Sequence, residues 1–218
     1  MSLYFLNDVL LLNFALEAAK SAFQRLSVLD LDFSQTRLTC LPCGVNSKVT
    51  YGLQLTMDEI TLHPIGVVRS PITDPSRDEY WGGIVSTVEL DPSAVGPDAL
   101  AGLEEFSHIQ VVYHFHQVAA DRVERGARHP QGRQEWPSVG ILAQRAKRRP
   151  NRIGVSTCRL LKAEPLKLTV EALDAIDGSP VIDVKPYMSG FGPREDVREP
   201  QWAKELMSTY YLKGTKTT

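Results

Sequence analysis

A succession of short strand-like segments limits what most of this 218-residue chain can fold into. After Met57, each segment is rich in β-branched residues and is bounded by Gly, Pro or Asp, which is typical of strands that end in turns. The connections are too short for repeated helical crossovers, so we expect a mainly antiparallel, all-β sheet closed as a barrel. The predicted strands are 65–70, 83–90, 108–118, 138–145, 153–161, 166–176 and 180–187.

Two further segments after Met57, 97–106 and 199–211, are predicted to be helices. In "AIDGSPVI", the Asp177-Gly178 pair predicts a hairpin turn between the last two strands, although Pro180 could shift the turn.

The first 56 residues differ from the rest of the chain, because apolar residues recur there at spacings of three and four, which predicts helix. They are either an accessory helical extension or upstream codons included by a wrong start ahead of Met57. The expected organisation is an extension (1–56), a barrel domain (57–190) and a C-terminal helix with its tail (191–218). The apolar positions are Leu11, Phe14, Ala15, Ala18, Ala22 and Leu26.

The three cysteines are an odd number, and Cys158 stands far from the Cys40/Cys43 pair. This argues against a disulfide framework and suits a reducing cytoplasm. The single CxxC is a weak zinc signal without a second pair. No apolar run reaches the roughly 18 residues of a membrane span. The chain also lacks GxGxxG after a strand, GxxxxGK[ST], GxSxG and HExxH, which argues against a Rossmann-type nucleotide site.

Positive charge is concentrated in residues 121–152. This stretch contains nine Lys/Arg and three acidic residues, in a chain of formal net charge −2. Such asymmetry is the electrostatic footprint of a phosphate-rich partner, and His129 and Trp136 offer surfaces for base stacking. The stretch predicts either a nucleic-acid-binding surface or a solvated loop.

Histidines alternate with aromatic residues in "SHIQVVYHFHQ". On a strand, His114 and His116 would share one face and Tyr113 and Phe115 the other. The histidines could be a metal pair, the polar wall of a ligand site, or simply solvent-exposed. No third ligand is obvious, so no metal is assigned.

Three polar residues alternate along the last predicted strand, so the side chains of Asp183, Lys185 and Tyr187 are expected on one side of it. A carboxylate, an amine and a phenol on one face form either an acid/base and positioning set or a salt bridge on a solvated face.

Four ordered segments resemble one known family: "HPIGVVRSP" (63–71), "GLEEFSHIQVVYHFHQ" (102–117), "VGILAQRAKRRPNRIGVS" (139–156) and "ALDAIDGSPVIDVKPY" (172–187). In order and spacing they are similar to the TrmO family, also called TsaA-like or YaeB-like. The resemblance implies a methyltransferase that depends on S-adenosyl-L-methionine (SAM), is built on a single β-barrel and acts as a homodimer. Bacterial members methylate N6 of threonylcarbamoyladenosine beside the anticodon of threonine tRNA, so tRNA is the expected partner.

The resemblance also implies which residues contact SAM. His116 and Gln117 end the family's "FxFHQ" strand, and Arg145 corresponds to the arginine of its "ATR" segment. A glycine after the first strand, Gly83, would approach the cofactor through its backbone, and the Asp174 carboxylate would take the methionine amino group or a ribose hydroxyl. The full expected set is Gly83, His116, Gln117, Arg145, Val155, Glu171, Ala172, Leu173 and Asp174.

The implied mechanism is direct methyl transfer to a nitrogen whose proton must leave, and Asp177 or Asp183 are the candidate acceptors. Lys185 and Tyr187 would position the substrate. Phosphates of the anticodon arm would be bound by Lys147, Arg148, Arg149 and Arg152.

This chain departs from the family in two places. It has "QRAKRRPNRIG" where members commonly have "TRSPFRPNPIG", and only about 30 residues follow Tyr187, where larger bacterial members carry a further domain. Two alternatives therefore stay open: a methyltransferase of the same fold with another substrate, and a non-catalytic RNA-binding β-barrel.

Overall fold

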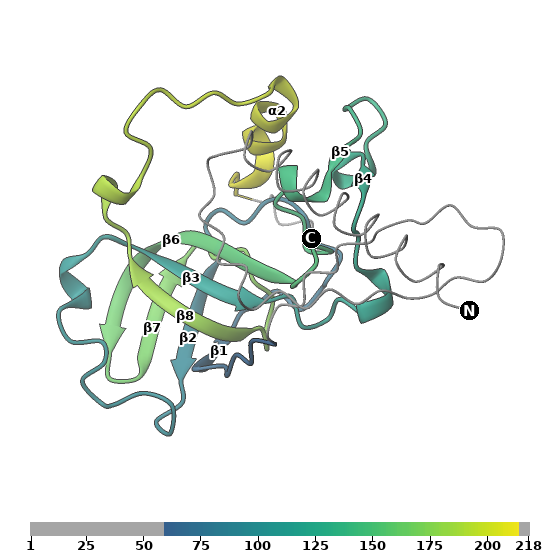
Figure 1. Cartoon of the computed structure of the whole chain (residues 1–218). Coiled ribbons are helices and arrows are strands. Elements are labelled where there is room, and N and C mark those ends of the chain that lie inside the picture. Colours follow the sequence, from purple (N-terminus) through teal and green to yellow (C-terminus); the bar gives the residue numbers. More distant parts are fainter. Residues whose placement is uncertain (1–58, 214–218) are drawn as a thin grey trace, which may run out of the picture. The chain divides into compact units, whose positions relative to one another are not determined.

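Six strands close into a barrel in which every neighbouring pair is antiparallel. The computed structural model describes residues 59–213. The strands neighbour one another in the order β1-β2-β7-β6-β3-β8 (Figure 1). This confirms the predicted antiparallel closed barrel. The strands are β1 (Gly66–Arg69), β2 (Val85–Leu90), β3 (His108–His114), β6 (Ile153–Glu164), β7 (Lys167–Glu171) and β8 (Pro180–Pro186).

Alternation along the strands fills the barrel. Ile109, Val111 and Tyr113 of β3 are buried, and the residues between them are more exposed, because successive side chains of a strand point to opposite faces. The Tyr113 ring lies against its partner on β6, where a Cβ added to Gly154 would come within 2.5 Å of the ring. Glycine at position 154 therefore makes room for the largest fully buried side chain.

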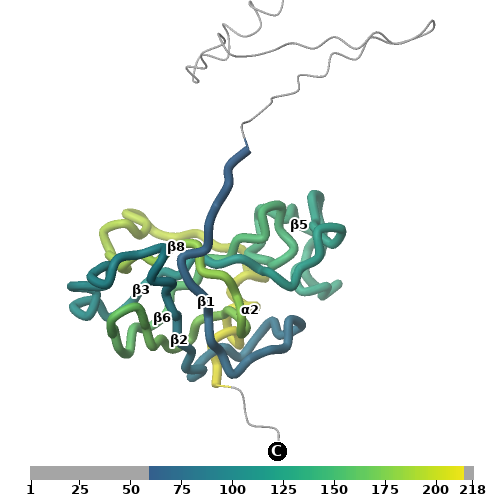
Figure 2. The backbone as a smooth tube through the Cα atoms, turned by 90° about the horizontal axis from the view of Figure 1, so that it is seen from below, coloured from purple at the N-terminus to yellow at the C-terminus, as the bar shows by residue number. Residues whose placement is uncertain are grey.

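The prediction of a barrel strand over 138–145 was wrong. Only β5 (Val139–Gly140) is extended there, and it pairs with β4 (Ala127–Arg128). Figure 2 shows β5 away from the barrel strands. A 3₁₀ turn (Ile141–Ala143) follows. The reason lies in Gln144, whose buried amide donates to the carbonyls of Arg128 and Val139 at 3.0 and 2.9 Å and so holds the chain in this turn.

The prediction of a helix over 97–106 was also wrong, because the segment forms turns and one 3₁₀ turn (Leu103–Glu105). Gly102 has a φ of 82°, a left-handed conformation that interrupts a helix. The C-terminal helix is confirmed as α2 (Gln201–Tyr210). The remaining 3₁₀ turns are Ala120–Arg122, Pro130–Gly132 and Ser189–Phe191.

The Asp177-Gly178 turn exists, but it does not close a hairpin. β7 pairs with β2 and β6, whereas β8 pairs with β1 and β3. The hairpin is formed instead by β6 and β7, across Pro165 and Leu166, with Leu166 at a φ of 58°. That turn has neither Gly nor Asn; its turn signal is Pro165, which does not indicate which strands pair.

The helical extension predicted for residues 1–56, with Cys40 and Cys43, lies outside the described residues. Within residues 59–213, no helix is long and apolar enough to span a bilayer.

Candidate functional site

The strand directions bring the expected cofactor residues to one end of the barrel. Because neighbours are antiparallel, the carboxyl ends of β1, β3 and β7 meet the amino ends of β2, β6 and β8. Gly83 precedes β2, His116 and Gln117 follow β3, Val155 lies near the start of β6, and 171–174 end and follow β7. We call this end of the barrel the Asp174 end.

Two phenols hold the Asp174 carboxylate. Tyr113, from inside the barrel, donates to the backbone oxygen of Asp174 at 2.8 Å and to Oδ1 at 3.1 Å. Tyr210, the last residue of α2, donates to Oδ2 at 2.7 Å. Burial, reinforced by the Asp174 charge, raises the pKa of both phenols, so both remain hydrogen-bond donors at neutral pH.

Polar and ionisable groups surround this carboxylate on the β6 side. The backbone N–H of Asp174 points to Ser156 Oγ at 3.5 Å. Burial and then the Asp174 charge raise the pKa of Tyr211 to about 12 and that of the Cys158 thiol to about 12. Cys158 is therefore an inert, protonated core residue rather than a nucleophile.

The segment that ends α2 packs against the glycines before β2. The N–H of Trp81 donates to the Tyr210 carbonyl at 2.9 Å, and a Cβ on Gly82 would lie 1.9 Å from the Tyr211 carbonyl oxygen. Gly83 has a φ of 73°, and the Lys213 side chain lies against it. A close backbone approach at these glycines was expected, but the chain's own C-terminal segment makes it.

Arg145 reaches the same end from the loop outside the barrel. Its guanidinium donates to the Val155 carbonyl, and its side chain is otherwise exposed. No described carboxylate forms an ion pair with Arg145, so its charge remains available to a ligand.

The two histidines do not share a strand face as predicted. β3 ends at His114, and the N–H of His116 donates to the His114 carbonyl at 2.8 Å, which turns the chain. Burial, with Arg152 and then His116, lowers the pKa of His114. The Nδ1 atom of His116 is buried without a hydrogen-bond partner among the described residues, and Gln117 is exposed. The described residues contain no group of three or more His, Cys, Asp or Glu able to hold a metal.

The residues that link β7 to Asp174 differ in what they can offer a ligand. Glu171 lies 3.5 Å from Arg159. Ala172 has a left-handed φ of 66°, fixed by its N–H bond to the Ile84 carbonyl at 2.9 Å. Leu173 is completely buried in the core. The Leu173 side chain is therefore not accessible to a cofactor.

The catalytic candidates do not all lie at the Asp174 end. Asp177 does, where its Oδ1 accepts the Ser70 N–H at 3.0 Å. Asp183 and Lys185 share one face of β8, as predicted, and form an ion pair at 2.6 Å. Lys185 lies opposite Gln110, and the Tyr187 N–H donates to the His108 carbonyl, so β8 carries these two residues toward the opposite end.

The basic residues are tied into the fold. Lys147 pairs with Asp78 at 2.9 Å, and Arg148 lies 3.9 Å from Glu124. Arg149 and Arg152 instead donate to the carbonyls of Gln144 and Val118, at 3.2 and 2.6 Å. A carbonyl does not neutralise a guanidinium, so these two arginines keep their charge.

Sequence reasoning missed three residues at this site: Tyr113, Ser156 and Tyr210. Tyr113 and Tyr210 are 61 and 36 residues from Asp174 along the chain. The sequence offered one weak signal, since buried tyrosines need a hydrogen-bond partner, but it could not name that partner.

Known proteins resemble this chain in sequence and in fold. Residues 69–192 match the model of the tRNA-methyltransferase O N-terminal domain. The tRNA (adenine(37)-N6)-methyltransferase of Escherichia coli K12 is 32% identical over 142 residues, covering 61% of this chain and 59% of that protein. An S-adenosyl-L-methionine-binding protein of Archaeoglobus fulgidus is 36% identical over 129 residues, 58% of this chain and 88% of that protein.

A solved structure, TrmO from Pseudomonas aeruginosa, superposes with a TM-score of 0.51 at 30% identity, covering 65% of this chain and 62% of that one. The chain thus spans about three fifths of the length of the E. coli enzyme and of this solved structure. The matched domain takes up more than half of the chain and contains the whole Asp174 end except the segment that ends α2. The chain belongs to the tRNA-methyltransferase O (TrmO) family.

Proposed function

We propose that this protein is a SAM-dependent methyltransferase that methylates N6 of adenosine 37 in tRNA, with threonylcarbamoyladenosine in threonine tRNA as its substrate. One observation carries the proposal: all nine expected cofactor residues fall inside the matched domain and gather at the Asp174 end or next to it. The name of the E. coli relative supplies the reaction, and the family resemblance supplies the threonylcarbamoyl group.

The Asp174 end is chemically suited to SAM. Asp174 offers a fixed carboxylate that, after accepting from two phenols, still has lone pairs for an ammonium or a ribose hydroxyl. Among the described residues, His116 Nδ1 has no hydrogen-bond partner and Arg145 has no ion-pair partner. SAM bound there would supply an electrophilic methyl group. The residues of this chain then have to position the accepting nitrogen and remove its proton.

Asp177 is the better proton acceptor of the two candidates. Asp183 pairs with the Lys185 ammonium at 2.6 Å and accepts the Val184 N–H at 2.9 Å, so its carboxylate oxygens already have partners. Asp177 accepts one backbone N–H and lies at the end where the cofactor set gathers. We therefore propose that Asp177 accepts the proton from the methylated nitrogen, and that Asp183 and Lys185 form only an ion pair on the surface.

The positive charge of the arginines at 148, 149 and 152 supports tRNA as the partner. Arg149 and Arg152 keep their charges, and Arg148 is only loosely paired, so these residues can contact phosphates of an anticodon arm. Lys147 is held by Asp78 and contributes less. The protein is further proposed to act as a homodimer, which light scattering would test.

SAM binding by isothermal titration calorimetry is the first test. We expect saturable binding by the wild-type protein and none by Arg145→Ala, which loses the charge beside Val155. Phe191→Ala is the control, since Phe191 is 91% exposed on a distant 3₁₀ turn. Methyl transfer is then measured on threonine tRNA with and without the threonylcarbamoyl group. Absence of SAM binding by the folded protein would favour the RNA-binding barrel, and binding without transfer to either tRNA would favour another substrate.

A further inference from the structure

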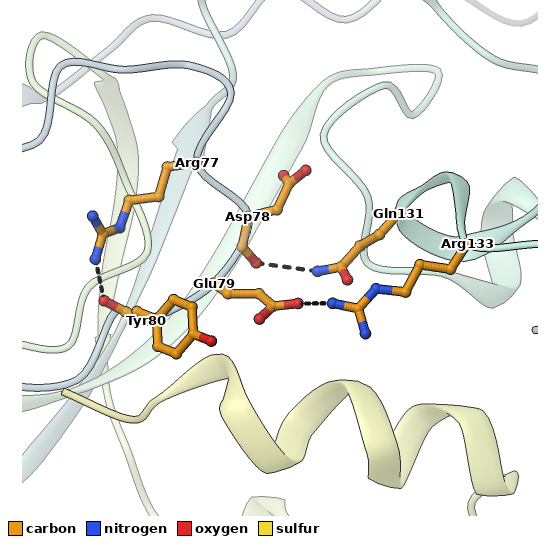
Figure 3. A pocket seen from close by; sticks show the side chains of 6 residues that line it. All are labelled: Arg77, Asp78, Glu79, Tyr80, Gln131 and Arg133. Atoms are coloured by element: carbon orange, nitrogen blue, oxygen red, sulfur yellow. Dashed lines mark hydrogen bonds and ion pairs between the residues drawn. The ribbon is translucent and has the colours of Figure 1, made fainter. Parts of the chain in front are cut away.

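An open surface pocket lies beside α2, between the loop that precedes β2 and the loop between β4 and β5. It has a volume of about 430 Å³. Figure 3 shows its lining side chains above the helix, with Gln131 facing the Asp78 backbone and Arg133 reaching Glu79. We call it the 77–133 pocket; its lining residues are Arg77, Asp78, Glu79, Tyr80, Gln131 and Arg133.

Contacts between the two loops fix the shape of the pocket. Arg133 pairs with Glu79, whose other carboxylate oxygen accepts from Thr209 of α2 at 3.0 Å. Gln131 Nε2 donates to the Asp78 carbonyl at 3.3 Å. The Arg133 guanidinium also lies over the Trp136 ring, 4.7 Å from its centroid. The pocket is therefore preorganised, which reduces the entropic cost of binding.

Some of the unfavourable local features of the described chain lie at this pocket. Tyr80 and Gln131 have left-handed φ values of 63° and 50°. Arg77 Nε and Gln131 Oε1 are buried without hydrogen-bond partners among the described residues. Backbone strain and unpaired buried polar groups each destabilise a fold, and they persist most often where a ligand uses them.

Charge and chemistry decide which ligand fits. Glu79 is neutralised by Arg133 and Asp78 by Lys147, which leaves Arg77 as the one lining cation without an ion pair among the described residues. A single guanidinium is not the cluster of cations that favours a phosphate. The walls hold the buried Arg77 Nε donor and the buried Gln131 Oε1 acceptor, neither with a partner among the described residues, and the ring of Tyr80, which is 42% exposed. An uncharged, planar group with donors and acceptors on its edge matches this set, and an unpaired nucleobase is such a group.

The pocket is connected to the Asp174 end through two adjacent residues. Thr209 donates to Glu79 in the pocket wall, and Tyr210 donates to Asp174. Consecutive residues lie about 3.8 Å apart between Cα atoms, so the same turn of α2 borders both sites. A nucleotide in the pocket would thus be a near neighbour of the one that is methylated.

We propose that the 77–133 pocket binds one unpaired nucleobase of the RNA substrate, beside the methylated nucleotide, with Tyr80 stacking on the base and Gln131 and Arg77 bonding its edge. This rests on the proposed function, because it takes the substrate to be RNA.

The test uses an anticodon stem–loop RNA and versions of it in which each loop base in turn is replaced by an abasic site. Wild-type protein should bind one abasic version at least about tenfold more weakly than the intact RNA, the loss expected of one stacked base. Tyr80→Ala should bind the intact RNA about tenfold more weakly than wild type and show no further loss with that abasic version. Tyr80→Phe, which keeps the ring, and Phe191→Ala should behave like wild type. Tyr80→Gly removes the ring in a residue suited to the left-handed backbone, so it separates loss of stacking from misfolding.

SAM affinity is measured in parallel on every variant and should not change. If Tyr80→Ala and Tyr80→Gly bind intact RNA like wild type, or still show the abasic penalty, the base is not bound in this pocket and the inference fails while the proposed function stands. Failure of the wild-type protein to bind SAM or methylate tRNA would instead remove the proposed function. Failure of wild type to bind the stem–loop at all would overturn the inference.

Discussion

At the scale of single residues, the site is organised around one carboxylate. Asp174 is held between a barrel tyrosine and the last residue of α2, both of them donors to it. Hydrogen bonds to a charged group are stronger than neutral ones, so removing one of them should be measurable.

Tyr210→Phe keeps the ring and removes the donor to Asp174 Oδ2. We expect SAM affinity to fall by roughly tenfold, about 1.4 kcal/mol, because the carboxylate loses one of the bonds that orient it. Calorimetry measures the affinity, and steady-state kinetics should show a raised KM for SAM with little change in kcat. Unchanged affinity would mean that Asp174 does not contact the cofactor.

Asp177→Asn tests the proton acceptor. The amide keeps an oxygen for the Ser70 N–H, so the turn should persist, whereas its basicity is lost. We expect kcat to fall by about 100-fold or more with SAM affinity unchanged. Asp183→Asn is the matched comparison, and a larger loss there would reverse the assignment.

A buried thiol and two buried phenols predict how the free energy of unfolding depends on pH. Cys158, Tyr113 and Tyr210 all have pKa values raised by burial, and that of Cys158 moves from 9.0 to about 12. The unfolded chain ionises these groups first, so the free energy of unfolding should fall as pH rises above about 9, by up to about 1.4 kcal/mol per pH unit for each group. Urea titrations at pH 7 to 11 measure it. Between pH 9 and 10, Cys158→Ala should have the flatter slope, and equal slopes would contradict a buried thiol.

At the scale of elements, side-chain contacts hold α2 against the loops beside the barrel. Trp136 Nε1 donates to Glu205 at 2.8 Å, and the Trp136 and Trp202 rings lie 6.4 Å apart. Together with the bonds from Thr209 to Glu79 and from Tyr210 to Asp174, these contacts fix the helix to the loop between β4 and β5, to the loop before β2 and to Asp174. The helix itself is predictable, whereas its partners are contributed by residues far away in the chain.

Gly82→Ala tests whether the segment that ends α2 belongs to the site. The added Cβ would lie 1.9 Å from a backbone oxygen of Tyr211, so the segment must shift. We expect a loss of about 1–3 kcal/mol in stability and weaker SAM binding. Gly190→Ala is the matched control, because a Cβ there meets nothing within 4 Å. Thermal unfolding and calorimetry read the two effects, and a Gly82 variant that behaves like the control would exclude the segment from the site.

At the scale of the whole molecule, some basic side chains between 121 and 152 form ion pairs with acidic residues, and others bond only backbone carbonyls. Replacing Arg148 and Arg149 together by Ala should weaken tRNA binding and lower the slope of log affinity against log salt by about one unit for each phosphate that the variant no longer neutralises. Binding measured from 50 to 200 mM salt gives the slope. Since Arg149 also bonds the Gln144 carbonyl, Arg149→Lys combined with Arg148→Lys, which keeps the charge, is the control. An unchanged slope in the Ala variant would make the stretch a solvated loop.

The sequence by itself determined the class of fold and the neighbourhood of the site. A period of two residues and short connections predict an antiparallel barrel, and such patterns depend only on neighbours a few residues apart. The motif residues flank strand ends, so their gathering at one end followed once the barrel closed.

The tertiary structure alone decided that β6 rather than β8 pairs with β7, that 138–145 leaves the barrel, and that Tyr113 and Tyr210 meet on Asp174. These outcomes depend on contacts between residues tens of positions apart, such as the Tyr113 ring against Gly154, and on which buried polar groups find partners. No local pattern encodes those choices, because packing selects them only when the whole barrel is formed.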